Sequence, residues 1–140
     1  MKYVLDTNAV SALMKGEANV IERLKRVARV DVSMPQPVVA EIAYGIERLP
    51  KSKRRDELTS RFELLKAELH RVPWSDEVSD TFGRIKAGLE RKGARIEDFD
   101  AAVAAHALAL GSILVTANVR HMTRVTGLKI EDWSTDLDGP

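Results

Sequence analysis

The chain has 140 residues, which suits one domain with a substantial buried core and leaves no room for two domains of ordinary size. Hydrophobic residues make up 44% and charged residues 31%, which excludes a largely disordered chain, and a formal net charge of +1 excludes nucleic-acid binding through bulk positive charge. The chain has no cysteine, which excludes disulfides and thiolate metal sites, and no apolar run reaches the ~20 residues of a membrane span. These features predict a soluble, cytoplasmic protein without a membrane segment.

The first predicted strand, Tyr3 to Leu5, ends on the polar residues Asp6, Thr7 and Asn8. In open α/β sheets, ligands bind at the carboxyl ends of the strands, so Asp6 is a candidate for chemistry. The alternative is that Asp6 only caps the following helix, since Asp, Thr and Asn are all good N-cap residues. If Asp6 belongs to a site, Thr7 or Asn8 can cap the helix instead.

Helices and short strands alternate along the rest of the chain. Apolar residues at helical spacing predict helices, and short runs of strand-favouring residues predict strands. In chain order we expect a helix at 9–14, a helix at 20–28, a strand at 32–34, helices at 37–49 and 51–69, a strand at 70–73, helices at 76–92 and 101–110, a strand at 113–116, a helix at 119–125 and a strand at 128–130. The alternation predicts one α/β domain over residues 1–133, with a parallel sheet between two layers of helices, and a flexible tail over 134–140.

Three more oxygen-bearing side chains stand at positions that suit a site. Glu41 lies at the edge of an apolar helical stripe. Asp100 shares a helix face with Val103 and Ala107, so it should point inward, whereas the helix dipole alone explains Asp98 in the same first turn. Asn118 follows the apolar strand at 113–116, which repeats the arrangement around Asp6.

Inward-pointing carboxylates need a positive partner, because burying an unpaired ion loses its hydration. No Lys or Arg on the same apolar faces supplies one. Divalent cations would, and ligands that are all oxygen suit Mg²⁺ or Mn²⁺ rather than zinc. Such a cluster can activate a water molecule and stabilise the charge that develops when a phosphodiester is cleaved, which is the chemistry of many nucleases.

Five segments together resemble the PIN-domain ribonucleases, specifically the VapC type of toxin–antitoxin toxins. They are Val4-Leu-Asp-Thr-Asn8, Val39-Ala-Glu-Ile-Ala-Tyr-Gly45, Asp100-Ala-Ala-Val-Ala-Ala-His-Ala107, Leu114-Val-Thr-Ala-Asn118 and Gly127-Leu-Lys-Ile-Glu-Asp-Trp133. The resemblance implies a five-stranded parallel sheet, a pocket for one or two Mg²⁺ or Mn²⁺ ions, and endonucleolytic cleavage of structured RNA such as tRNA or ribosomal RNA. It also implies a homodimer or higher oligomer and inhibition by a small cognate antitoxin protein.

The resemblance also assigns roles to individual residues. The predicted catalytic residues are Asp6, Glu41, Asp100 and Asn118. The three carboxylates match the family's metal ligands, and the amide stands where many PIN domains have a fourth acid, which leaves the number of ions open. Asp98 could share the role of Asp100, although the interval from Asp100 to His106 matches the family better. Thr7 and Thr116 flank the pocket and could orient ligands through their hydroxyls, although bonding to backbone is the commoner use of a hydroxyl.

The helix predicted at 51–69 opens on a basic cluster. The cluster contains Lys51, Lys53, Arg54 and Arg55, and it is either a solvated helix face or an RNA contact.

Two other functions compete with that of a ribonuclease. One is a catalytically weak PIN module that only binds RNA or a partner. The other is a phosphatase-like hydrolase with Asp6 as covalent nucleophile. Such enzymes usually carry a second acid two residues later, where this chain has Asn8.

Overall fold

Five parallel strands form a central sheet in the order β3-β2-β1-β4-β5. The structure is a computed structural model, and it describes residues 2–136. The strands are β1 (Tyr3–Leu5), β2 (Val32–Pro35), β3 (His70–Val72), β4 (Ile113–Val115) and β5 (Ile130–Glu131). The predicted parallel α/β fold with five strands is therefore confirmed.

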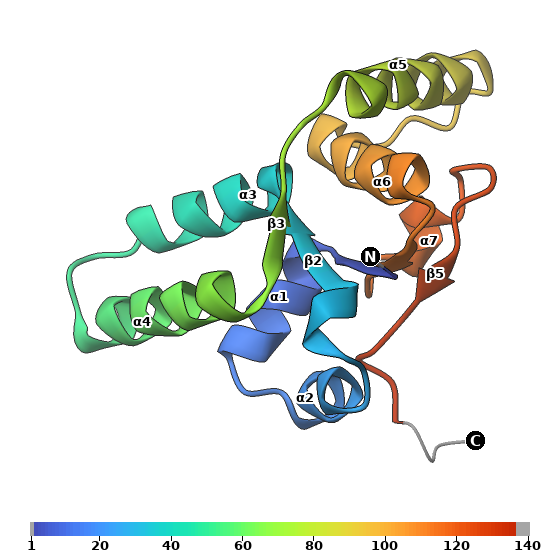
Figure 1. Cartoon of the computed structure of the whole chain (residues 1–140). Coiled ribbons are helices and arrows are strands. Elements are labelled where there is room, and N and C mark those ends of the chain that lie inside the picture. The colour runs from blue at the N-terminus through green and yellow to red at the C-terminus, as the bar shows by residue number, and fades with distance from the viewer. Residues whose placement is uncertain (1, 137–140) are drawn as a thin grey trace.

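Helices connect the successive strands (Figure 1). They are α1 (Thr7–Met14), α2 (Ala18–Lys25), the short 3-10 helix η1 (Arg29–Asp31), α3 (Gln36–Glu47), α4 (Lys53–Glu68), α5 (Asp76–Arg91), α6 (Asp98–Leu110) and α7 (Val119–Met122). Helices α3 and α4 lie side by side and project together away from the sheet, and α5 packs along α6.

Strand β1 lies in the middle of the sheet, where its three residues are buried. Val4 pairs with Ser33 of β2 on one side and with Leu114 of β4 on the other. The connection from β3 to β4 passes to the far side of β1, so the direction of strand order reverses there. Right-handed crossovers then put α1 and α2 on one face and α5 and α6 on the other. The carboxyl ends of β1 and β4 consequently bound the crevice where α/β sheets bind ligands.

Helix α6 is the most deeply buried helix of the described chain. All seven residues from 101 to 107 are buried, six of them Ala or Val and the other His106. Small side chains allow α6 to approach the sheet closely, and this approach fixes the acidic first turn of the helix at the carboxyl edge of β1. Gly111 ends the helix with a φ of 64°, a left-handed conformation that suits glycine, as the sequence predicts.

Two predicted helices differ in their limits because of local capping. Helix α1 begins at Thr7, two residues earlier than predicted, because Asp6 itself is the N-cap. Helix α4 begins at Lys53 because the Ser52 hydroxyl caps it, accepting a hydrogen bond of 3.1 Å from the Arg55 N–H.

Three other predicted elements end differently because tight turns interrupt them. The helix expected at 20–28 stops at Lys25, after which the chain turns into η1. The helix expected at 119–125 is only four residues long. The last strand is shifted to Ile130–Glu131 because Gly127, with a φ of 82°, closes a turn over the residues where the strand was expected to begin.

The predicted tail at 134–140 falls partly outside the described residues, which end at 136. The carbonyl of Ser134 accepts a hydrogen bond of 2.9 Å from the Asn19 amide, so the chain contacts the start of α2 at this point. Over residues 2–136, no helix has the length and apolar character needed to cross a membrane.

Candidate active site

Asp6 occupies the end of β1 and is both a helix cap and a buried carboxylate. Its N–H donates to the Val115 carbonyl at 2.9 Å, which continues the pairing of β1 with β4. Its side chain is the N-cap of α1, accepting from the Thr7 N–H at 2.7 Å. The residue is only 2% exposed. The expectation that Thr7 or Asn8 would take over the capping is therefore wrong, because the same carboxylate caps the helix and faces the crevice.

Thr116 connects the ends of the two central strands through its hydroxyl. The hydroxyl donates to Asp6 Oδ2 at 2.7 Å and accepts from the Asn8 amide at 3.2 Å and from the Asn118 N–H at 2.9 Å. Asn8 completes the connection, because its Oδ1 accepts from the Ala117 N–H at 2.8 Å. These bonds hold the Asp6 carboxylate in one orientation. The sequence suggested Asn8 only as a helix cap, whereas in the structure its side chain bonds to Thr116 and Ala117, which follow β4.

Glu41 reaches the same crevice from α3, which follows β2 directly. Its Oε1 accepts a hydrogen bond of 2.7 Å from the Thr7 hydroxyl, so Thr7 links the start of α1 to α3. Helix α3 starts immediately after β2 because Pro37, in its first turn, needs no hydrogen-bond acceptor for its nitrogen. The half-buried Glu41 side chain therefore lies one turn above the sheet edge, near Asp6.

Asp100, Asn118 and His121 form the opposite side of the site. The Asn118 amide nitrogen donates to Asp100 Oδ2 at the long distance of 3.5 Å, and His121 Nδ1 donates to Asn118 Oδ1 at 2.7 Å. His121 therefore holds the amide with its NH₂ group toward Asp100. The sequence analysis assigned no role to His121. The spacing of three residues from Asn118 within a helical segment was the available signal.

The three carboxylates interact electrostatically. Burial, followed by the negative charges of Asp6 and Glu41, raises the pKa of Asp100 from 3.8 to about 6, while His121 opposes the rise. Burial also raises the pKa of Asp6, against the hydrogen bond from Thr116. Within residues 2–136, none of the three carboxylates forms an ion pair with Lys or Arg. The site therefore concentrates negative charge that no Lys or Arg ion pair among the described residues balances.

An open cleft of about 880 Å³ leads to this group of side chains. Glu41, Asp100 and His121 line it together with Arg95 and the half-exposed Phe99. Its wall therefore presents two of the carboxylates together with a cation.

A comparison with protein families identifies this arrangement. The sequence profile of the PIN domain matches residues 3–128, which include the strands β1 to β4, whereas β5 lies just beyond the match. The chain belongs to the PIN domain family. Known PIN-domain proteins of similar length narrow the assignment. Ribonuclease VapC2 of Haemophilus influenzae is 33% identical and ribonuclease VapC2 of Rickettsia felis 30% identical, each match covering 95% of this chain and 98% of the relative.

Solved PIN-domain structures agree with this assignment. The toxin chain in the VapBC2 complex of Rickettsia felis, bound to a DNA fragment from its promoter, has a TM-score of 0.85 at 28% identity, with 95% of this chain and 99% of that chain covered. VapBC-1 of nontypeable Haemophilus influenzae gives a TM-score of 0.82 at 28% identity, with 96% and 100% covered. The chain is a VapC-type PIN-domain ribonuclease, the toxin component of a toxin–antitoxin system.

PIN-domain nucleases generally depend on divalent metal ions, and the donor set at this site fits such an ion. All candidate ligands are carboxylate or amide oxygens, which is the preference of hard divalent cations. In the described part of the chain, however, no three His, Asp or Glu side chains are grouped closely enough to form a ready-made ligand set. The carboxylates share one electrostatic field but are not preassembled.

Asp98 lines the same cleft, but its carboxylate forms an ion pair with a lysine of α5. Its Oδ1 is 3.1 Å from Lys86 Nζ of α5, in an exposed ion pair. The structure thus brings Asp6, Glu41, Asp100 and Asn118 together with Thr7 and Thr116, and keeps Asp98 at the cleft wall.

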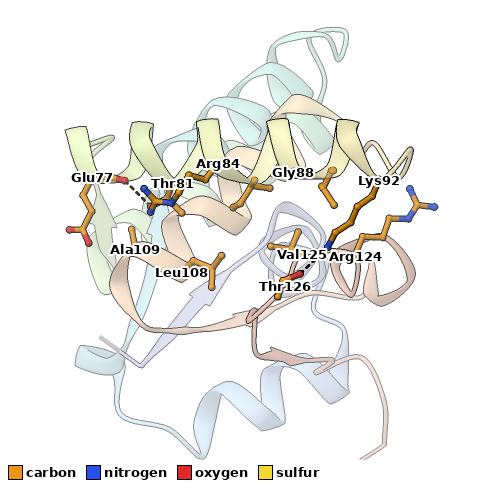
Figure 2. Close-up of a pocket in the computed structure, with 12 residues that line it drawn as sticks. Glu77, Thr81, Arg84, Gly88, Lys92, Leu108, Ala109, Arg124, Val125 and Thr126 are labelled. Atoms are coloured by element: carbon orange, nitrogen blue, oxygen red, sulfur yellow. Dashed lines mark hydrogen bonds between the residues drawn. The ribbon is translucent and has the colours of Figure 1, made fainter.

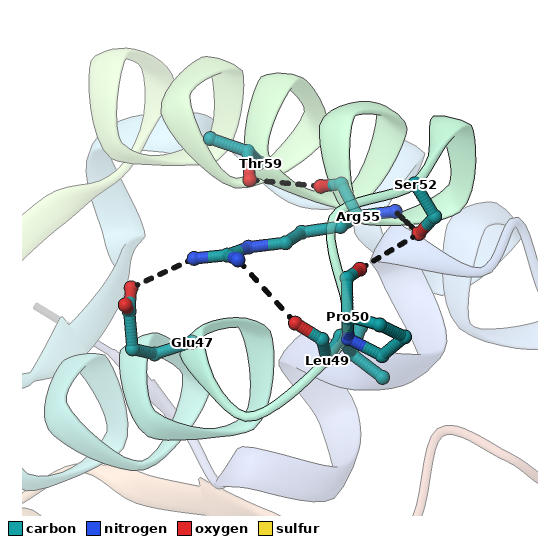
Figure 3. Close-up of polar contacts among 6 residues, drawn as sticks. All are labelled: Glu47, Leu49, Pro50, Ser52, Arg55 and Thr59. Carbon is teal, nitrogen blue, oxygen red and sulfur yellow. Dashed lines mark hydrogen bonds and ion pairs between the residues drawn. The ribbon is translucent and has the colours of Figure 1, made fainter.

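Two further features lie outside the PIN site. A pocket between α5 and α6 contains none of the predicted site residues (Figure 2). In the basic cluster, Arg55 is bound within the protein: its guanidinium lies 3.1 Å from Glu47 Oε2 and donates to the Leu49 carbonyl at 3.3 Å, which fastens α4 to the end of α3 (Figure 3). Arg54 instead lines a groove of about 260 Å³ that extends to Thr7 and Glu41. Lys51 and Lys53 are exposed.

Proposed function

We propose that the ribonuclease activity of this chain depends on a divalent cation held by Asp6, Glu41 and Asp100, with Asn118 beside them. The observation that supports this proposal is the raised pKa of Asp100, because burial and two neighbouring carboxylates cause it. A divalent cation would reverse the sign of the local potential and favour the ionised form of all three acids. The half-buried Glu41 and Asp100 side chains supply the freedom that grouping around an ion requires.

Each residue then has a distinct task. Asp6 is the fixed ligand, because Thr116 and Asn8 hold both orientation and position of its carboxylate. Thr7 positions Glu41 through its hydroxyl. The NH₂ group of Asn118, oriented by His121, donates to Asp100 and is available to a phosphate oxygen. A bound ion would activate a water molecule and stabilise the negative charge that develops as the phosphodiester is cleaved.

Mg²⁺ or Mn²⁺ is the proposed ion, since the ligands are oxygen atoms only. A neutral amide at Asn118 in place of a fourth acid lowers the charge available to a second ion. Calorimetric titration of Mn²⁺ into the protein would give the number of ions directly.

We further propose that the substrate is a structured RNA, such as a tRNA or ribosomal RNA, and that the products carry 5′-phosphate and 3′-hydroxyl ends. The support comes from a relative: the tRNA(fMet)-specific endonuclease VapC of Shigella flexneri is 28% identical over 96% of this chain and 99% of its own length. The similar VapBC structures support a small antitoxin as partner, and we expect a homodimer of this chain in its active form.

The test is cleavage of a tRNA mixture by purified protein freed of antitoxin, with Mg²⁺ or Mn²⁺ and with EDTA. We expect cleavage only with metal, and loss of cleavage in Asp100→Asn. Asp98→Asn is the matched control, because Asp98 is two residues away, exposed and paired with Lys86. Cleavage that persists in EDTA, or in the Asp100→Asn variant, would refute the metal-dependent mechanism.

The two rival functions have their own signatures. A module that only binds RNA would arrest growth equally as wild type and as Asp100→Asn. A covalent nucleophile at Asp6 would leave an acyl-phosphate on that residue, which mass spectrometry of the trapped protein would detect. We expect neither result.

A further inference from the structure

The pocket between α5 and α6 has a volume of about 380 Å³ and an apolar floor. Its floor is formed by Ile85, Leu89, Leu108, Ala109 and Val125. Gly88 lies in its wall on α5, and a Cβ atom added at Gly88 would meet nothing within 4 Å. Ligand pockets in proteins usually span about 300 to 1,000 Å³, so the volume of this one suits a small group rather than a large ligand.

Three cationic side chains surround this apolar floor. Figure 2 shows Lys92 and Arg124 at one end and Arg84 toward the other, near Glu77, the only acid among the described residues that line the pocket. Lys92 Nζ donates to the Thr126 hydroxyl at 3.4 Å, and Arg84 donates to the Thr81 hydroxyl at 3.1 Å. Across residues 2–136, none of the three cations forms an ion pair with a carboxylate. The pocket therefore combines an apolar surface with unpaired positive charge.

The basic end of the pocket is joined to the active-site cleft. The Arg124 guanidinium donates to the Arg95 carbonyl at 2.8 Å, and Arg95 lines the cleft that also contains Asp100. A chain of cations, Arg95, Arg124 and Lys92, thus runs from the cleft to the pocket. A polyanionic strand bound in the cleft would contact these cations where it extends beyond the cleft.

We propose that the α5–α6 pocket binds one nucleotide of the RNA substrate outside the cleaved bond, with the base on the apolar floor and a phosphate between Lys92 and Arg124. A nucleobase has an apolar face that any such floor accepts, and its phosphate supplies the negative charge that the rim lacks. The proposal rests on the ribonuclease function, since the nucleotide belongs to the bound substrate.

A pair of glycines on α5 provides a matched test. Gly88→Leu fills the pocket, whereas Gly83→Leu places the same side chain on an exposed turn of the same helix that does not line the pocket. Leucine favours a helix more than glycine does, so both variants should fold. Binding is measured by fluorescence anisotropy with a labelled single-stranded RNA of about 12 nucleotides. This length lies toward the upper end of the range that one single-strand-binding domain covers. Asp100→Asn protein in EDTA serves as background, so that cleavage cannot interfere.

We expect Gly88→Leu to weaken RNA binding about tenfold and Gly83→Leu to leave it unchanged. The double change Lys92→Gln with Arg124→Gln should lower the slope of log K against log salt concentration by about 0.7, the value for one phosphate contact on a single strand, whereas Arg91→Gln on the exposed side of α5 should change it far less. Equal binding by the two leucine variants overturns the proposal. The proposal is also overturned if adenosine monophosphate binds the pocket while Gly88→Leu binds RNA as tightly as the wild type does. The ligand of the pocket is then a free nucleotide. Both measurements stand even if the wild-type protein fails to cleave RNA.

Discussion

The Asp100→Asn substitution should stabilise the metal-free protein while it abolishes cleavage. It removes one of three mutually repelling carboxylates, and the new amide keeps the size of the side chain. Folding raises the pKa of Asp100 from 3.8 to about 6, chiefly through burial and then through Asp6 and Glu41. A shift of this size corresponds to about 3 kcal/mol. We reduce it to about 1 to 2 kcal/mol, since Asp100 is only half-buried and solvent screens its charge.

The sign of this effect depends on pH. The folded-state pKa lies above the unfolded one, so the ionised carboxylate destabilises the folded protein fully above a pH of about 6 and not at all below 3.8. In EDTA at pH 8, we expect Asp100→Asn to unfold about 3 to 8 °C above the wild type, and the difference should vanish near pH 4. Thermal unfolding followed by circular dichroism measures it, with Asp98→Asn as control. An equal gain at both pH values, or a lower melting temperature at pH 8, would refute the reasoning.

Three further predictions concern the rest of the site and its support. Thr116→Val should cost about 1 to 3 kcal/mol in urea unfolding, because the buried Asp6 carboxylate loses one of its hydrogen-bond donors, and Thr116→Ser should recover most of the loss. Arg55→Gln should cost about 1 kcal/mol through the bonds to Glu47 and Leu49, whereas Lys53→Gln should stay within about 0.5 kcal/mol. Mn²⁺ at about 100 times its Kd should stabilise the wild type by about 2.7 kcal/mol in calorimetry, and EDTA should abolish the gain.

The order of elements could be predicted from the sequence because hydrophobic periodicity records burial. The strand at Tyr3–Leu5 and the helix ending at Gly111 were found because apolar runs there are long or sharply bounded. The last strand begins two residues later than predicted, since its apolar pattern is short and does not mark where the turn at Gly127 ends.

Long-range polar contacts set the limit for the site. The position after a strand selected Asp6, positions on helix faces selected Glu41 and Asp100, and the resemblance to PIN-domain ribonucleases joined the three into one site. No sequence pattern specifies that Thr116 donates to Asp6 or that His121 orients Asn118, because these bonds depend on the relative placement of separate elements. The role of Arg55 was missed for the same reason: its partners Glu47 and Leu49 face it only once α3 and α4 pack together.

The pairing of β1 with β4 has a consequence for how the enzyme is made. Asp6 and Thr116 are separated by 110 positions along the chain. At about 5 to 20 residues per second, a ribosome therefore releases β4 roughly 5 to 20 s after β1. Until then the Asp6 carboxylate has no fixed orientation and the central strand has no partner on that side. A growing toxin chain, surrounded by the RNA of the ribosome, thus carries no finished nuclease site until β4 has emerged and paired with β1.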